Sequence, residues 1–184
     1  MSKQQPQTIK HILVEAPANA TQGLLHFQGR SFLCALGRSG IASEKREGDG
    51  VTPTGTFALR ALRYRPDRVS APQSTLPTQA LEPEDGWCDA PDDPAYNQPV
   101  TVPYTASHET LWREDHLYDI VIMLGYNDDP IVPGKGSAIF FHLAKQKDGS
   151  LQPTEGCVAL ALSDMLEVLK DVTPQTMMEI RLSA

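Results

Sequence analysis

Short apolar runs separated by glycine, proline and polar turn residues constrain the fold of this 184-residue chain more than any other feature. Runs of this length that end at turn signals are typical of β-strands. The tripeptide Gln28-Gly29-Arg30 adds a hairpin signal between two of them. Strands are therefore predicted over residues 9–14, 24–27, 31–36, 57–64, 118–124, 137–142, 157–160 and 177–182.

Little of the remaining sequence favours helix. The best candidate is residues 163–170, with Ser163 as the N-cap and Asp164 at the positive end of the helix. Residues 66–103 are rich in Pro, Asp, Gln and Ser, and we expect a long irregular loop there. No repeat or second core is visible, so a single domain over residues 1–184 is predicted. These elements predict a mainly β fold, a sandwich or open barrel of mixed strands with one or two short helices.

Composition excludes several classes of protein. The 16 Lys and Arg against 23 Asp and Glu give a net charge of −7, so no nucleic-acid partner is expected. No apolar run approaches the length of a transmembrane segment, and the polar N-terminus shows no secretory signal. The three cysteines are interpreted as free thiols, with Cys34 in the core and Cys88 in a loop. No cofactor-binding motif is present, and no cofactor is expected.

The strongest indication of chemistry lies in residues 137–160. An apolar run ends on His142, and Cys157 follows a polar turn directly before a second apolar run. A cysteine attacks as a thiolate, so an adjacent imidazole can activate it. The connection has the length of a modest hairpin, which would lay the two strands side by side, and Gly156 leaves room for a substrate backbone. The alternative is a cysteine packed as a small hydrophobe and a core histidine with satisfied hydrogen bonds.

This segment resembles the catalytic signature of the L,D-transpeptidases (YkuD-type domains). In that family, a His that ends a strand is followed after a turn by Ser/Thr-His-Gly-Cys, a hydrophobic residue, and Asn or Arg. The matching positions are His142, Thr154, Gly156, Cys157 and Val158. Two positions depart from the signature: Glu155 replaces the second His, and Ala159 replaces the Asn or Arg. Further resemblance lies in residues 37–40, 45–57 (which contain TPTGTF), 86–91, 107–109 and 124–128.

The resemblance implies a YkuD-like fold and a cysteine-dependent acyltransferase. Cys157 would be the nucleophile and His142 its base, with a backbone carbonyl orienting the imidazole. The oxyanion would be held by backbone N–H groups, for which Gly156 and Cys157 are the inferred donors. The donor would be a peptidoglycan stem peptide that loses a terminal D-alanine next to diaminopimelate. The acceptor would be an amine of a neighbouring stem.

A substrate with several carboxylates requires cationic side chains. Arg38, Lys45 and Arg46 are the candidates, with a solvated surface cluster as the alternative interpretation. Tyr126 and Asn127 end a strand that is expected beside that of His142, so they are predicted to line the cleft unless they only form a turn. The other predicted substrate-binding residues are Thr154 and Glu155, and we hypothesise that Glu155 binds the cationic amine of the acceptor. Trp112, His116 and Tyr118 could form an aromatic wall or pack in the core.

Three other functions compete with transpeptidation. An L,D-carboxypeptidase would pass the acyl group to water, and a wall-binding module would have no active thiol. A structural zinc site would use Cys88, Cys157, His116 and His142, although these ligands lack close paired spacing. The periplasm or cell envelope is the expected location on functional grounds, with the cytoplasm as the alternative. The sequence leaves the oligomeric state open.

Overall fold

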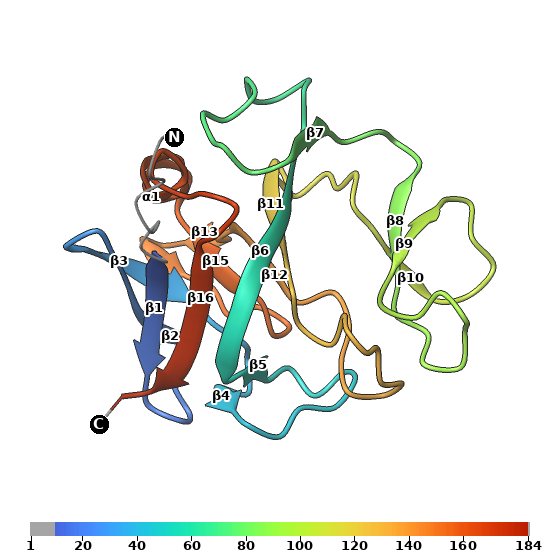
Figure 1. The fold of residues 1–184 in the computed structure, drawn as a ribbon, viewed down its shortest axis with the longest axis horizontal. Helices are drawn as coiled ribbons and strands as arrows, with labels where there is room; N and C mark the ends of the chain where they lie inside the picture. Colours follow the sequence, from blue (N-terminus) through green and yellow to red (C-terminus); the bar gives the residue numbers. More distant parts are fainter. Residues whose placement is uncertain (1–9, 184) are drawn as a thin grey trace, which may run out of the picture.

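The centre of the molecule is a β-barrel (Figure 1). In the computed structural model, which describes residues 10–183, its strands are β1 (His11–Ala16), β2 (Gln22–Phe27), β3 (Arg30–Ala35), β6 (Gly55–Tyr64), β7 (Thr78–Ala80), β11 (Ile120–Leu124), β12 (Phe140–Leu143), β15 (Val158–Leu160) and β16 (Met177–Leu182). They form one sheet in the order β11-β12-β15-β3-β2-β1-β16-β6-β7. A further pairing of β6 with β11 joins the two sides of this order, so the sheet closes on itself. Closure leaves no open edge at that point.

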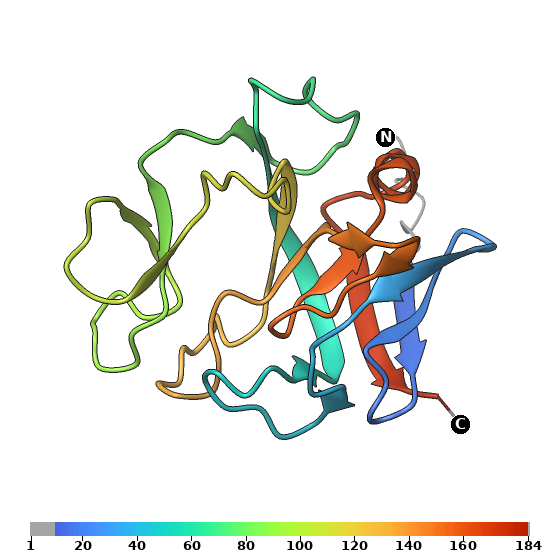
Figure 2. The ribbon, with the colours of Figure 1, turned by 180° about the vertical axis from the view of Figure 1, so that it is seen from behind.

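Three smaller sheets surround the barrel. They are β8 (Asp85–Cys88) with β9 (Pro99–Thr101) and β10 (His108–Thr110), β13 (Gln146–Lys147) with β14 (Ser150–Leu151), and β4 (Ile41–Ala42) with β5 (Thr52–Pro53). Figures 1 and 2 show β8, β9 and β10 as a lobe on the side of the barrel away from the helix. The segment 66–103, expected to be a long irregular loop, thus contributes three short strands.

Local sequence explains most of the barrel strands. The turn between β2 and β3 has positive φ angles at Gln28 (51°) and Gly29 (74°), the conformation that matches a two-residue hairpin, so this prediction is confirmed. All five residues of β11 are buried, as expected for a continuous apolar run in a central strand. The predicted strand start at Ile9 lies outside the described residues, and the strand expected from Ser137 begins at Phe140 instead.

The single helix of residues 10–183, α1 (Leu162–Leu169), differs from its prediction at the first turn. It begins after Ala161, directly behind β15, and no side chain caps it. The Ser163 hydroxyl is therefore already inside the helix, where it contacts the Asp164 carboxylate at 3.3 Å. Packing replaces the cap as the stabilising factor, because the helix buries its apolar side, Met165, Val168 and Leu169, on the core.

Two apolar clusters lie on opposite faces of β11 and β12. Ile122 and Phe141 point into the barrel core, which also contains Cys34 as predicted. The alternate residues, including Val121 and Phe140, face a second cluster completed by Leu81, Leu111, Tyr118, Met123 and Cys157. The second cluster includes residues next to the β8–β10 lobe, so burial on both faces accounts for the apolar sequence of these strands. Within residues 10–183, no helix has the length and apolar character to cross a membrane.

Candidate active site

Two neighbouring parallel strands bring Cys157 and His142 together. In the register of β12 and β15, His142 lies opposite Ala159, so Cys157 comes next to Phe140. Phe140 and His142 are two residues apart and share a face of the sheet. The predicted hairpin between residues 142 and 157 is wrong: the strands are parallel, and their connection includes the small hairpin β13–β14. A parallel pair needs this longer return because both strands start at the same end of the sheet.

Both side chains line one cavity of about 900 Å³. Its walls come from the loop after β4, from β10, and from the segments 113–118, 137–142 and 152–157. Five of the predicted site residues line it, namely Lys45, His142, Thr154, Glu155 and Cys157. The other five lie outside the lining in the part of the chain that the structure describes: Arg38, Arg46, Tyr126, Asn127 and Gly156.

The Cys157 thiol is neutral in this arrangement. Its sulfur accepts a hydrogen bond from Phe140 N and donates one to the Ala138 carbonyl, both at 3.3 Å. Within residues 10–183, no hydrogen bond links it to His142. Burial raises the pKa of Cys157 to about 12, and the Glu109 carboxylate adds to the effect, while the Phe140 N–H, Lys45 and Arg113 oppose it. The thiol therefore stays protonated at neutral pH unless a base removes its proton.

The His142 imidazole is suited to remove that proton. Its Nδ1 lies 2.8 Å from the Leu143 carbonyl, an acceptor only, so Nδ1 carries the hydrogen and Nε2 keeps the lone pair. This contact is of the kind that the family resemblance implied for orienting the imidazole, a backbone carbonyl. Burial lowers the pKa of His142 to about 4, even though the carbonyl hydrogen bond opposes the shift. The side chain is thus a neutral base at physiological pH.

The turn before β15 fixes the backbone of Cys157. Thr154 Oγ1 accepts a hydrogen bond from Gly156 N at 3.1 Å and donates one to the Cys157 carbonyl at 2.7 Å. The Thr52 hydroxyl makes a longer contact with the same carbonyl, at 3.4 Å. The Gly156 N–H, predicted to hold the oxyanion, is therefore used inside the turn in this conformation. Thr154 also lines the cavity, so its contact with a substrate stays a prediction.

A comparison with known families agrees with this arrangement. The sequence matches the L,D-transpeptidase catalytic domain (YkuD) family over residues 11–180. The chain belongs to this family. No curated protein sequence matches it significantly.

Solved structures with a similar fold have low sequence identity to this L,D-transpeptidase domain. The helical cell shape determining protein Pgp2 from Campylobacter jejuni is 17% identical with a TM-score of 0.47. An L,D-transpeptidase from Mycobacterium smegmatis is 14% identical with a TM-score of 0.43, and L,D-transpeptidase 3 from Mycobacterium tuberculosis is 12% identical with a TM-score of 0.41. The alignments cover 96%, 94% and 94% of this chain and 48%, 59% and 61% of the others, so it spans about half to three fifths of their length.

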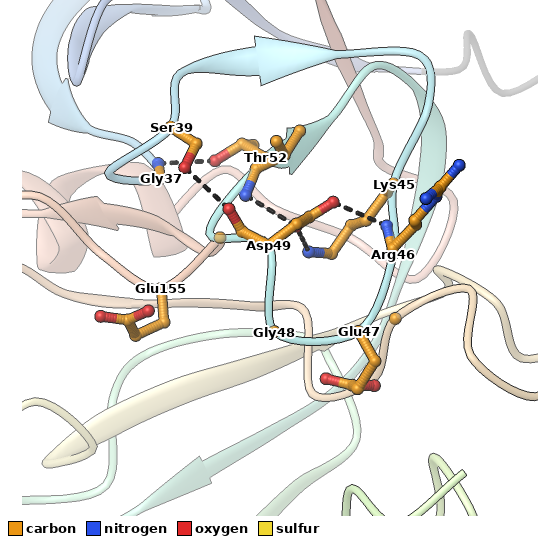
Figure 3. Close-up of polar contacts among 12 residues, drawn as sticks. Gly37, Ser39, Lys45, Arg46, Glu47, Gly48, Asp49, Thr52 and Glu155 are labelled. Atoms are coloured by element: carbon orange, nitrogen blue, oxygen red, sulfur yellow. Dashed lines mark hydrogen bonds and ion pairs between the residues drawn. The ribbon is translucent and has the colours of Figure 1, made fainter.

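The predicted cations of this L,D-transpeptidase domain divide into one buried and two exposed residues. Lys45 is buried and reaches into the site, where its ammonium contacts Asp49 at 2.8 Å. Arg46 follows it but is exposed, and its side chain points away from Asp49 (Figure 3). Arg38 binds the Glu155 carboxylate at 2.7 Å and the Gly48 carbonyl at 3.0 Å. Arg38 thus forms an ion pair with Glu155, the carboxylate that we expected to bind the acceptor amine. The Glu155 side chain is 81% exposed.

Tyr126 and Asn127 hold a loop together instead of lining the cavity. Asn127 has a φ of 49° and bonds Val132 and Gly136 through its side chain. The Tyr126 hydroxyl donates to the Lys135 carbonyl, and its ring packs edge-on against Phe57. The turn interpretation of this segment therefore describes their contacts.

An acidic group that sequence reasoning missed lies beside Cys157 and His142. Glu109, on β10, lines the cavity and accepts hydrogen bonds from Tyr118 at 2.6 Å and Arg113 at 3.1 Å. The Tyr118 ring in turn packs edge-on against His142, with ring centroids 5.1 Å apart. Burial raises the pKa of Glu109 despite these two partners. Only the resemblance of residues 107–109 to the family pointed to this segment, and no spacing in the sequence relates it to Cys157.

Of the predicted aromatic wall, Tyr118 lines the cavity, whereas Trp112 packs against the second apolar cluster and His116 lies outside the lining. Trp112 stacks on the Arg65 guanidinium, 3.8 Å from the ring centroid, and His116 is exposed beside Asp119. The zinc alternative is also wrong, because residues 10–183 contain no group of three or more His, Cys, Asp or Glu placed to hold a metal ion. Cys88 is buried in β8 rather than in a loop.

Proposed function

We propose that this chain is a peptidoglycan L,D-transpeptidase that cross-links stem peptides through a thioester on Cys157. The observation that carries the proposal is the single cavity shared by the Cys157 thiol and a neutral His142 imidazole on adjacent parallel strands. Membership of the L,D-transpeptidase catalytic domain family supports the substrate class.

The proposed acylation starts from the neutral pair. The Sγ–H turns from the Ala138 carbonyl to His142 Nε2, which takes the proton as sulfur attacks the amide carbonyl carbon of the donor stem. The S–C bond forms, and the π electrons of the carbonyl move onto its oxygen. When the tetrahedral intermediate collapses, the C–N bond breaks and the departing amine takes the proton from Nε2. The donor stem remains as a thioester.

The second step transfers the acyl group. An uncharged amine of a second stem attacks the thioester carbon and gives one proton to His142 Nε2. The C–S bond breaks, and the sulfur recovers a proton from Nε2, which regenerates the thiol. Charges of both signs line the cavity, with Lys45, Arg113 and Lys145 among six carboxylates. The cations suit the carboxylates of the donor, and the carboxylates suit the amine of the acceptor.

Hydrolysis is the second candidate function. An L,D-carboxypeptidase would share the acylation step and let water attack the thioester, releasing D-alanine from tetrapeptide stems. The ion pair between Glu155 and Arg38 favours this alternative, because it removes one carboxylate from binding the acceptor amine. The raised pKa of Cys157 is the feature that favours the third candidate, an inactive wall-binding module.

Product masses separate these functions. We expect purified protein with tetrapeptide-bearing muropeptides to yield a cross-linked dimer that has lost one D-alanine, and Cys157→Ala to yield none. Tripeptide as the sole product would assign a carboxypeptidase. If the substrate is unchanged, the inactive wall-binding module is the remaining candidate function. A peptidoglycan substrate would also place the reaction in the cell envelope, in the periplasm, unless soluble wall fragments are used in the cytoplasm.

A further inference from the structure

A buried lysine reaches the turn that carries the nucleophile. The Lys45 side chain is 3% exposed and lines the same cavity as Cys157. Lysine is almost never buried unless a partner compensates its charge. Its polar partner among the described residues is the Asp49 carboxylate, at 2.8 Å (Figure 3). Although burial opposes it, hydrogen bonds from Lys45 and from the N–H groups of Arg46 and Val51 lower the pKa of Asp49, which keeps this partner ionised.

Two glycines, Gly136 and Gly156, leave room for the Lys45 side chain. A Cβ at Gly136 would lie 2.8 Å from Lys45 Cε, and a Cβ at Gly156 would lie 3.3 Å from Lys45 Nζ. The ammonium therefore lies against the backbone of the residue directly before Cys157. Any larger residue at these two positions would push the lysine away from the turn.

The ammonium retains unused hydrogen-bonding capacity. An ammonium has three N–H donors, and Asp49 accepts one of them within residues 10–183. Because Lys45 lines the cavity, its remaining N–H donors can bind an anion that forms there. Arg113, the other cation that acts on the sulfur, already binds Asp115 and Glu109.

We propose that the Lys45 ammonium stabilises the negative charge that develops on the Cys157 sulfur as His142 removes its proton. This role rests on the proposed acyl transfer and adds an electrostatic group to it. The charged and titratable groups facing the sulfur are Lys45, Glu109, Arg113, Tyr118 and His142. Of these, Lys45 supplies a positive charge from the side of the nucleophile turn, where it offsets the repulsion from Glu109.

Alkylation of Cys157 tests this role without any stem peptide. The rate of reaction with iodoacetamide, followed by mass spectrometry of the Cys157 peptide, reports the fraction of thiolate. For Lys45→Met we expect the rate at pH 8 to fall about tenfold or more, the effect of one nearby charge on a thiol in a partly shielded site. Lys147→Met removes the same charge from the exposed strand β13 and should leave the rate unchanged.

A second variant controls for the hydrogen bond to Asp49 that Lys45→Met also removes. Lys45→Gln removes the charge but keeps an N–H donor for Asp49, and we expect it to slow alkylation as Lys45→Met does. A wild-type rate in either variant that still unfolds cooperatively would overturn the proposal.

A charged reagent separates this role from simple binding of substrate carboxylates. Stabilisation of the thiolate predicts that both variants slow iodoacetamide and the anionic iodoacetate to a similar extent. A loss confined to iodoacetate would overturn the proposal and assign Lys45 to carboxylate binding. Because neither reagent is a stem peptide, failure of the proposed transpeptidation would appear separately, as absence of products from muropeptides.

Discussion

Burial controls the protonation of the two side chains proposed to react. Cys157 and His142 are almost fully buried, which raises the pKa of the thiol to about 12 and lowers that of the imidazole to about 4. A thiolate paired with an imidazolium is therefore not the resting state. Under the proposed acyl transfer, we therefore expect His142 to remove the thiol proton only as the sulfur attacks a bound carbonyl carbon.

The buried imidazole predicts a loss of stability in acid. The pKa of His142 is lowered from 6.5 to about 4 on folding, so the unfolded chain takes up its proton first as the pH falls. Its contribution is complete above pH 6.5 and is lost between about pH 6.5 and 4, with a total of about 3 kcal/mol. Urea unfolding of wild type and His142→Gln from pH 8 to 4 measures it. Parallel pH profiles of the two proteins would contradict the neutral buried imidazole.

The charge of Glu109 predicts an effect opposite to that of Lys45. Its carboxylate raises the pKa of Cys157, and Gln at this position keeps an oxygen for the Tyr118 hydroxyl. Glu109→Gln should speed iodoacetamide alkylation at pH 8 about threefold to tenfold. Glu82→Gln, an exposed change outside the cavity, serves as the control. A rate equal to or below that of wild type would show that the carboxylate does not act on the sulfur.

Among the elements, the turn from Thr154 to Cys157 and the parallel pair β12–β15 form the site. Gly156 has a φ of 137°, a conformation for which glycine is strongly preferred, and it packs against the backbone of the loop that carries Lys45. The turn thus connects Cys157 to the loop that carries Lys45 through backbone contacts. A larger residue at Gly156 should therefore disturb both Cys157 and the loop that carries Lys45.

Gly156→Ala should destabilise the domain by about 3 kcal/mol, because strain in φ adds to a backbone clash. The new Cβ would lie 2.8 Å from the Val51 carbonyl oxygen. Gly149→Ala is the matched control, since Gly149 also has a positive φ (77°) but nothing within 4 Å of the added carbon. It should cost only about 1 kcal/mol. Equal losses in urea unfolding would mean that the close approach at Gly156 contributes nothing.

The sequence predicted elements better than their connections. The strand ending on His142 and the strand after Cys157 were identified because each is a short apolar run. Their parallel pairing was missed because a short polar connection is compatible with a hairpin until the β13–β14 hairpin within it is known. The predicted N-cap at Ser163 is wrong because the end of β15, and not a capping side chain, decides where α1 begins.

For the whole molecule, closure of the barrel and packing of the β8–β10 lobe decide what the site contains. Closure joins β6 to β11, which are separated by more than 50 residues in the sequence, and no local pattern specifies that pairing. The lobe brings Glu109 to Cys157, and its short strands lack the apolar periodicity that reveals the barrel strands. Burial by the complete fold also distinguishes Lys45 from Arg46, two cationic residues that are adjacent in sequence.

The most direct measurement is the intact mass of the protein after exposure to tetrapeptide muropeptides. We predict a covalent adduct on the wild type, with the mass of the donor stem minus D-alanine, that maps to Cys157 and forms far more slowly on His142→Gln. Cys157→Ala should gain no mass. An adduct of equal yield on Cys157→Ala, or none on a folded wild type under conditions where the muropeptide is consumed, would contradict acylation of this thiol.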